Sequence, residues 1–191
     1  MENDTSPQKL LLAFVGMPGS GKSEAAIYLK QKGFAYARFG EITEEGLGKM
    51  NLQLTPENEQ MFREKIRAEF GMAAYAIHSK EKITSLLHDH TVLVIDGLYS
   101  WEEYVYLLEK FKGLKIVYVF ASPAIRYTRL MNRAVRPLTA DEARVRDFAE
   151  IEKLNKSGPI AMADYVIENN LTLGEFHQKI DELVNTLGVT A

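Results

Sequence analysis

The chain has 191 residues, a formal net charge of −3 and no cysteine. The lack of cysteine excludes disulfides, thiolate catalysis and cysteine-ligated zinc or iron–sulfur sites, and the charge gives no general attraction to nucleic acid. The longest apolar run, residues 10–15, is too short to span a bilayer, and residues 1–10 lack a signal-peptide pattern, so we expect a cytoplasmic protein without a membrane partner.

Strand and helix patterns alternate along the whole chain. Apolar segments typical of buried strands occupy residues 10–15, 34–38, 91–95, 114–120 and 165–167. Helical patterns occupy residues 22–32, 55–88 with a break near Gly71, 100–111, 122–133, 140–154 and 173–187. This alternation predicts an α/β fold in which helices cover both faces of a parallel sheet. No linker divides the chain, so we expect one domain over residues 1–191, with excursions from the core at 41–76 and 134–158.

A phosphate-binding loop follows the first strand. It reads Gly16-Met17-Pro18-Gly19-Ser20-Gly21-Lys22-Ser23 and matches the P-loop pattern at every fixed position. Glycines let the backbone N–H groups approach phosphate oxygens, and the following helix N-terminus adds partial positive charge. In this chemistry Lys22 bridges the β- and γ-phosphates and the Ser23 hydroxyl ligates magnesium. We therefore expect ATP and Mg²⁺ to bind here, rather than interpreting the segment as a plain glycine-rich turn.

An acid closes the third predicted strand. Asp96 follows residues 91–95 and precedes Gly97. An acid at the carboxyl end of a strand beside the P-loop strand faces the ligand crevice, where it can hold magnesium or orient an attacking oxygen. The alternative is a turn-forming Asp-Gly pair without a chemical role.

Arginines gather between residues 126 and 146, where no lysine occurs. They are Arg126, Arg129, Arg133, Arg136, Arg144 and Arg146. Arginine is favoured where planar, bidentate contact with phosphate matters. The spacing puts the first three on one helix face, with a core-facing stripe of Tyr127, Leu130, Met131 and Ala134 opposite. Pro137 predicts a hinged lid over residues 134–140. The alternative is a solvated face whose arginines pair with Asp141, Glu142 and Asp147.

With these features in place, the chain resembles the nucleoside monophosphate kinase group of P-loop kinases, above all the archaeal-type adenylate-kinase-related proteins. The matching stretches are AFVGMPGSGKS, TPENEQ with IRAEFGMAA, VLVIDGLYS, ASPAIRYTRLMNR and IAMADYVIENN, the last also similar to dephospho-coenzyme A kinases. The resemblance implies a three-layer P-loop sandwich with strand order 2-3-1-4-5, an acceptor-binding insertion and an arginine-bearing lid. It implies that Arg133 is the lid-helix arginine near the donor phosphates and that Arg144 or Arg146 corresponds to the second arginine pair of the family, beyond the lid.

Two acceptor-binding arginines of that group are missing. The G-D-x-x-R pattern of adenylate kinases reads Gly40-Glu41-Ile42-Thr43-Glu44 here, and Tyr99 stands where an arginine is expected after Asp-Gly. The D-A-D acid motif of dephospho-coenzyme A kinases is also absent. The remaining candidates for acceptor binding are Arg38, Glu41, Arg63 and Arg67, of which Arg67 ranks first because it lies within the IRAEFG match.

The residues predict phosphoryl transfer from ATP, with Mg²⁺, to a small phosphorylated acceptor, foremost a nucleoside monophosphate. We expect Lys22, Asp96, Arg133, Arg136, Arg144 and Arg146 to be catalytic, and Arg129 to help the P-loop hold the nucleotide. The partners are small-molecule nucleotides, and no nucleic-acid partner is expected. Two alternatives stay open: activity like that of dephospho-coenzyme A kinase, or a nucleotide-hydrolysing switch without a small acceptor. The sequence leaves the oligomeric state open.

Overall fold

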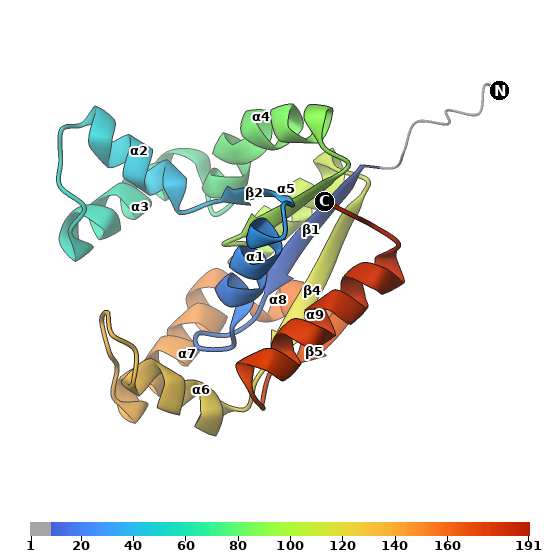
Figure 1. The fold of residues 1–191 in the computed structure, drawn as a ribbon. Helices are drawn as coiled ribbons and strands as arrows, with labels where there is room; N and C mark the ends of the chain where they lie inside the picture. The colour runs from blue at the N-terminus through green and yellow to red at the C-terminus, as the bar shows by residue number, and fades with distance from the viewer. Residues whose placement is uncertain (1–8) are drawn as a thin grey trace.

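The computed structural model describes residues 9–191. Its sheet strands are β1 (Leu10–Val15), β2 (Ala35–Arg38), β3 (Val92–Asp96), β4 (Leu114–Phe120) and β5 (Tyr165–Glu168). All four strand pairings are parallel and the order is β2-β3-β1-β4-β5, so the predicted fold class and strand order are confirmed (Figure 1). The central β1 pairs Phe14 with Asp96 on one side and with Val117 on the other, which carries the P-loop and Asp96 to the same edge.

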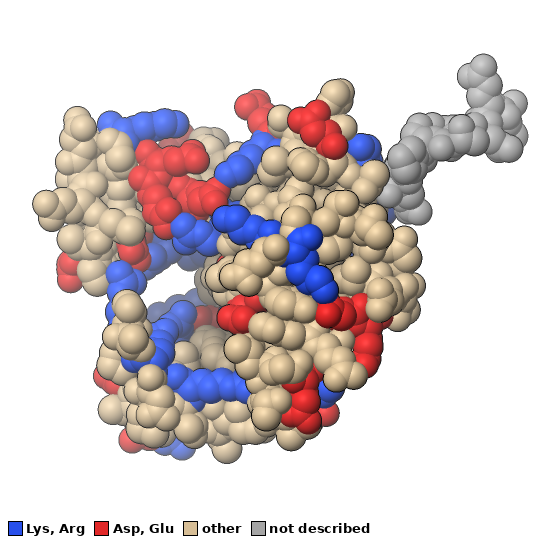
Figure 2. Space-filling model, viewed as in Figure 1, with Lys and Arg blue, Asp and Glu red and all other residues tan. Residues whose placement is uncertain are grey.

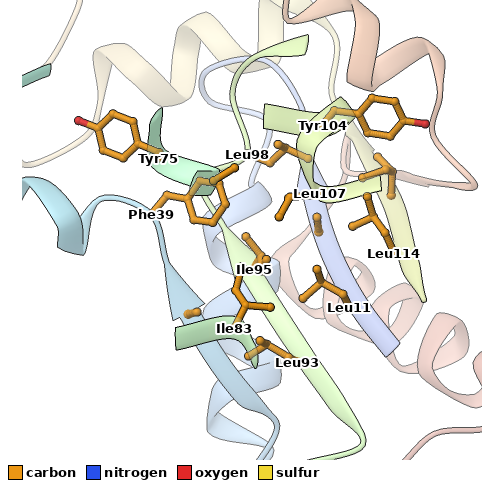
Figure 3. Close-up of a cluster of buried hydrophobic side chains, with 14 of the residues drawn as sticks. Leu11, Phe39, Tyr75, Ile83, Leu93, Ile95, Leu98, Tyr104, Leu107 and Leu114 are labelled. Atoms are coloured by element: carbon orange, nitrogen blue, oxygen red, sulfur yellow. The ribbon is translucent and has the colours of Figure 1, made fainter. Parts of the chain in front are cut away.

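Helices cover both faces of the sheet and extend beyond its carboxyl edge. They are α1 (Lys22–Gln31), α2 (Glu41–Lys49), α3 (Pro56–Phe70), α4 (Ala74–Asp89), α5 (Trp101–Lys110), α6 (Pro123–Met131), α7 (Ala140–Leu154), α8 (Ser157–Ala161) and α9 (Leu173–Leu187). The alternating strand side chains split the core in two. On the face of α4 and α5, Leu11, Ile83, Leu93, Ile95 and Leu107 pack together (Figure 3). On the face of α1 and α9, Phe14 packs with Leu29, Phe176 and Ile180.

Helix α2 was not predicted from the sequence. Its segment contains Gly46 and Gly48, and glycine in a helix interior normally lowers helix stability. The structure supplies a reason for Gly46, because a Cβ there would lie 2.2 Å or closer to two ring carbons of Phe62 in α3. Close packing between α2 and α3 therefore needs the glycine, and tertiary contact overrides the local preference.

The predicted break near Gly71 is confirmed. Gly71 has a φ of 73° and separates α3 from α4. Side chains cap the starts of two helices: the Thr55 hydroxyl accepts from Asn58 N at α3, and Ser100 with Glu103 forms a capping box at the start of α5. Within residues 9–191, no helix is long and apolar enough to cross a membrane.

Candidate active site

The P-loop lies at the carboxyl edge of β1 and leads directly into α1. Gly21 has a φ of 101°, and a Cβ on it would lie 2.3 Å from the Asn169 side-chain nitrogen, so only glycine fits this close approach. Asn169 donates to the carbonyl of Ser20 and accepts from Arg129 at 3.2 Å, so the β5–α9 connection and α6 both brace the loop. The Ser20 hydroxyl is buried and has no partner among the described residues.

Ser23 and Asp96 meet beside the loop. The Ser23 hydroxyl donates to the Asp96 carboxylate at 3.0 Å, and Asp96 is only 4% exposed. Tyr36 of β2 also donates to this carboxylate, at 3.4 Å. Residues 9–191 hold no cluster of three or more His, Asp or Glu that could bind a metal alone. The two oxygen ligands fit a Mg²⁺ ion that completes its octahedron with nucleotide phosphates and water.

Lys22 is the first residue of α1 and is 9% exposed. The pKa of its ammonium is lowered to about 7, chiefly by burial and also by the neighbouring Lys156, and Glu150 and Asp96 partly offset these effects. No acceptor for the Lys22 ammonium is found within residues 9–191. A buried ammonium without a paired anion is the arrangement that a phosphate group would stabilise.

A cavity of about 560 Å³ opens next to this site, between α3 and the carboxyl edge of the sheet. Its walls include Phe39, Tyr75 and Tyr99, and its acids are Glu44, Glu59 and Glu150. Five arginines line it: Arg38, Arg63, Arg67, Arg136 and Arg146. In Figure 2, basic side chains line the hollow between the α2–α3 region and the α6–α7 region. The cavity is therefore suited to an anionic ligand adjacent to the P-loop.

Arg67 differs from the other arginines of the cavity. Arg38 pairs with Glu44 at 2.5 Å, and both Arg63 and Arg136 pair with Glu59. Arg67 has no ion-pair partner in the described part of the chain, and its buried Nε has no hydrogen-bond acceptor there. Its guanidinium lies 5.7 Å from the centre of the Tyr75 ring. Arg67 thus offers an uncommitted guanidinium at the cavity wall.

The segment around Pro137 reaches across the cavity to α3. Arg133 donates to the carbonyl of Arg136, whose own guanidinium forms two 3.2 Å hydrogen bonds with the Glu59 carboxylate. Arg136 has a φ of 52°, a left-handed conformation that a non-glycine residue rarely adopts. Within residues 9–191, the predicted lid segment is therefore joined to the insertion by the Arg136–Glu59 ion pair, in which the arginine is exposed and the glutamate is largely buried.

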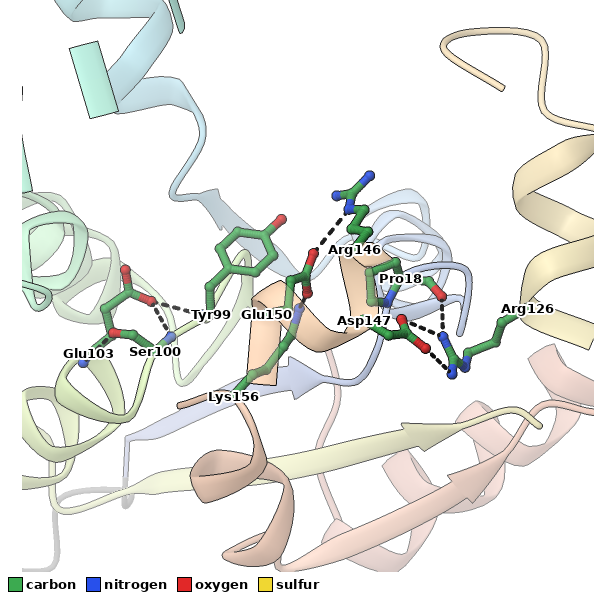
Figure 4. Close-up of polar contacts among 9 residues, drawn as sticks. All are labelled: Pro18, Tyr99, Ser100, Glu103, Arg126, Arg146, Asp147, Glu150 and Lys156. Atoms are coloured by element: carbon green, nitrogen blue, oxygen red, sulfur yellow. Dashed lines mark hydrogen bonds and ion pairs between the residues drawn. The ribbon is translucent and has the colours of Figure 1, made fainter. Parts of the chain in front are cut away.

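Arg126 is buried by a bidentate ion pair with Asp147 of α7, at 3.0 and 2.7 Å (Figure 4). Its guanidinium also donates to the carbonyls of Pro18 and Ala121. The alternative interpretation from the sequence expected an arginine to pair with Asp147 on a solvated helix face. The structure contains an arginine pair with Asp147, but this pair is buried. The predicted core-facing stripe was wrong for Met131 and Ala134, which are exposed because the chain leaves the helix at Met131.

Among the predicted site residues outside the P-loop and its magnesium pair, four do not line the cavity: Arg129, Arg133, Arg144 and Glu41. Arg144 is exposed and pairs with Asp141 at 2.6 Å. Glu41 pairs with Lys82 of α4. By contrast, Arg146 lines the cavity and donates to Glu150 at 3.1 Å.

Sequence reasoning missed Glu150 and Lys156. Glu150 of α7 lines the cavity and accepts from both Arg146 and the buried Lys156 (Figure 4). Burial opposes its ionisation, but Lys156, Lys22 and Arg146 hold the pKa of its carboxyl below the usual value. The only available signal was the four-residue spacing from Arg146, which is typical of many surface pairs.

Comparisons with known proteins agree with this architecture. Residues 12–150 match the family described as AAA domain. A UPF0200 protein of Thermococcus onnurineus is 33% identical over 182 residues, which cover 93% of this chain and 98% of the relative. A UPF0200 protein of Hyperthermus butylicus is 34% identical over 181 residues, covering 94% and 95%.

Two solved structures share the fold. A shikimate kinase from Bacteroides thetaiotaomicron has a TM-score of 0.61 at 12% identity, with 94% of this chain and 99% of that chain covered. A gluconokinase from Sinorhizobium meliloti has a TM-score of 0.55 at 14% identity, with 95% and 97% covered. At these identities the likeness establishes a kinase-like P-loop fold, while the closer resemblance to adenylate-kinase-related or dephospho-coenzyme A kinases stays a prediction. By its match to the archaeal relatives over nearly its whole length, the chain belongs to the UPF0200 family, with an AAA-type P-loop domain at residues 12–150.

Proposed function

We propose that this protein transfers the γ-phosphoryl group of ATP to a small anionic acceptor in the cavity beside the P-loop, and that the acceptor is a nucleoside monophosphate. The observation that supports this most is the uncommitted Arg67 guanidinium on the wall of a cavity that also holds Arg146 and Tyr99. An ATPase switch needs no such pocket. The names of the solved neighbours, shikimate kinase and gluconokinase, also favour a small acceptor.

Each group of side chains would have a separate task. The P-loop backbone would bind the donor phosphates and Lys22 would stabilise charge on the β- and γ-phosphates. Ser23 and Asp96 would hold Mg²⁺, which supplies charge neutralisation at the phosphates when bound. Arg146 would face the transferring group from the acceptor side, since it lines the cavity. Arg133 and Arg136 would act through closure of the lid segment, which excludes water from the reacting groups.

The direct experiment is an ADP-release screen with the purified protein, ATP and Mg²⁺. The acceptors would be nucleoside and deoxynucleoside monophosphates, dephospho-coenzyme A, shikimate and gluconate, with a reaction lacking acceptor as the reference. Release that depends on a monophosphate, together with a diphosphate product, supports the proposal. Equal release in every reaction would show hydrolysis and contradict it.

Metal removal tests the Ser23–Asp96 site. We expect transfer to disappear in excess chelator and to return on addition of Mg²⁺ or Mn²⁺, because both are hard cations that prefer the oxygen ligands found here. Turnover would be followed by ADP release before and after chelation. Full turnover in chelator would rule out a magnesium-dependent mechanism.

Arg67→Ala tests the acceptor cavity. We expect the acceptor KM to rise at least about tenfold, roughly 1.4 kcal/mol, because a charge-assisted contact to the acceptor anion is lost. The Kd for ATP should stay close to that of the wild type. Lys65→Ala is the matched control, because Lys65 lies on the same helix but lines a different hollow, with Phe62 and Ile66. An unchanged acceptor KM in Arg67→Ala would remove Arg67 from acceptor binding.

A further inference from the structure

A second buried lysine lies beside Lys22. Lys156 follows α7 and is 1% exposed. Its ammonium nitrogen lies 4.7 Å from the centre of the Tyr99 ring, and that of Lys22 lies 5.7 Å from the same centre. Two elements far apart in sequence, the P-loop helix and the α7–α8 junction, thus bring two ammonium groups to one aromatic ring.

The position of Lys156 is built into the fold. Asn155 ends α7 in a left-handed conformation, with a φ of 49°, and turns the chain back toward the sheet. The backbone N–H of Lys156 then donates to the carbonyl of Glu150 at 3.3 Å. Two residues later, Gly158 lies so close to Trp101 that a Cβ there would come within 2.5 Å of the indole ring. The lysine stem is therefore directed inward by a fixed turn.

Glu150 alone does not satisfy this lysine. An ammonium group has three hydrogen-bond donors, whereas the described residues supply one side-chain acceptor to Lys156, the Glu150 carboxylate. That carboxylate is shared with Arg146 and also acts on Lys22. Three basic groups, Lys156, Lys22 and Arg146, therefore act on one Glu150 carboxylate, while Glu103 and Asp96 act on the two lysines from a longer distance without a hydrogen bond to either. The buried N–H donors of Lys156 that find no side-chain acceptor favour the binding of an anion.

We propose that Lys156 is a second phosphate-binding lysine, which contacts the γ-phosphoryl group of ATP from the acceptor side while Lys22 contacts it from the P-loop side. We place Lys156 on the acceptor side of the phosphoryl group because Tyr99 and Glu150, which both contact it, line the acceptor cavity. Because Glu150 occupies one donor, Lys156 can bind phosphate without leaving its pair. The inference rests on the proposed binding of ATP at the P-loop.

The competing interpretation is that Lys156 only neutralises Glu150 and fixes the end of α7. The two interpretations differ in what Glu150 does. If the pair is purely structural, loss of either partner should have the same effect on ATP binding. If Lys156 binds phosphate, Glu150 repels the nucleotide, so its neutralisation should strengthen ATP binding while loss of the lysine weakens it.

The test is equilibrium titration of the full chain with ATP and with ADP, both with Mg²⁺. For Lys156→Met we expect ATP binding to weaken at least about tenfold and ADP binding to change by less than about twofold, because ADP lacks the γ-phosphate. Glu150→Gln should bind ATP more tightly than the wild type does. Lys115→Met is the control, because Lys115 also forms a lysine–carboxylate pair, with Asp164, outside the site.

Lys156→Met removes one of the two basic partners of the buried Glu150 and leaves Arg146, so thermal unfolding would be measured alongside binding. Should the single variant unfold, Lys156→Met/Glu150→Gln removes both charges and should fold, and its preference for ATP over ADP should be lower than that of Glu150→Gln alone. Equal loss for ATP and ADP, or no loss, would overturn the proposal, as would a Glu150→Gln variant that reproduces the Lys156→Met loss.

These outcomes are separate from those for the proposed function. If the wild type transfers phosphate to none of the acceptors but Lys156→Met still loses its preference for ATP, the inference stands and the proposed reaction fails. If the wild type transfers phosphate while Lys156→Met keeps that preference, the reaction stands and the inference fails. A wild type that binds neither nucleotide overturns both.

Discussion

Replacing Lys22 by methionine is expected to abolish phosphoryl transfer and, at the same time, to stabilise the nucleotide-free protein. The rate should fall at least about a hundredfold, the scale for losing one preorganised charge partner of the transition state. Stability should rise because methionine keeps the unbranched apolar stem of Lys22 and removes a buried ammonium that the described residues do not pair. The free-energy cost of burying the Lys22 ammonium would be offset only when a phosphate group binds.

The stability gain should depend on pH. The pKa of Lys22 is lowered from 10.5 to about 7, chiefly by burial, so between these values the unfolded chain holds a proton that the folded protein has released. Stability of the wild type therefore rises with pH across this window, and the penalty is largest below pH 7. The advantage of Lys22→Met should be greatest at pH 6 and should shrink toward pH 10, as measured by chemical denaturation.

A control on the same helix separates the local effect from a general one. Lys30→Met removes an exposed lysine from the last turn of α1 and should change neither turnover nor the pH dependence of stability. Wild-type turnover in Lys22→Met would remove this lysine from the reaction. A variant less stable than the wild type at pH 6 would show that the buried ammonium is compensated in the folded protein.

The features that the sequence predicted correctly are those encoded by neighbouring residues. The P-loop pattern and the buried strands each depend on short-range spacing, so the strand positions and the parallel sheet follow from the sequence. The strand order came from resemblance, and the structure confirms it. Helix α2 was missed because its two glycines are poor helix formers in isolation, and only the Phe62 ring of α3 explains one of them.

The burial of the other residues of the candidate site depends on contacts between segments that are distant in the sequence. Helical spacing put Arg126 on the same face as Arg129 and Arg133, yet Arg126 is 5% exposed because Asp147, from a different helix, neutralises it. Lys156 lies in a polar stretch, residues 155–158, that is typical of a solvated turn. It is buried because the tertiary fold places this turn against Tyr99. Local pattern cannot distinguish such residues from surface charges, because the pairing partner is set by the tertiary fold.

Asp147→Ala is expected to be the most destabilising single change in the lid region. It would leave the Arg126 guanidinium buried without its carboxylate, and breaking a buried pair in this way costs about 3–5 kcal/mol of the free energy of unfolding. The hydroxyl of Tyr127, which donates to the same carboxylate at 3.0 Å, would also lose its acceptor. Thermal unfolding should shift downward by on the order of 10 °C.

The same variant should weaken nucleotide binding, although Asp147 does not line the cavity. Arg126 donates to the Pro18 carbonyl at 3.0 Å, so the buried pair ties α7 to the P-loop, and its loss should loosen the loop that binds phosphate.

Asp141→Ala is the matched control, since it removes an aspartate from an arginine pair on the same helix, but an exposed one that should contribute little to stability. Arg126→Met/Asp147→Leu should recover part of the lost stability, because replacing both charges leaves no buried ion unpaired. If Asp147→Ala and Asp141→Ala unfold at the same temperature, the Arg126–Asp147 pair does not stabilise the fold, and its link to the P-loop has no energetic consequence.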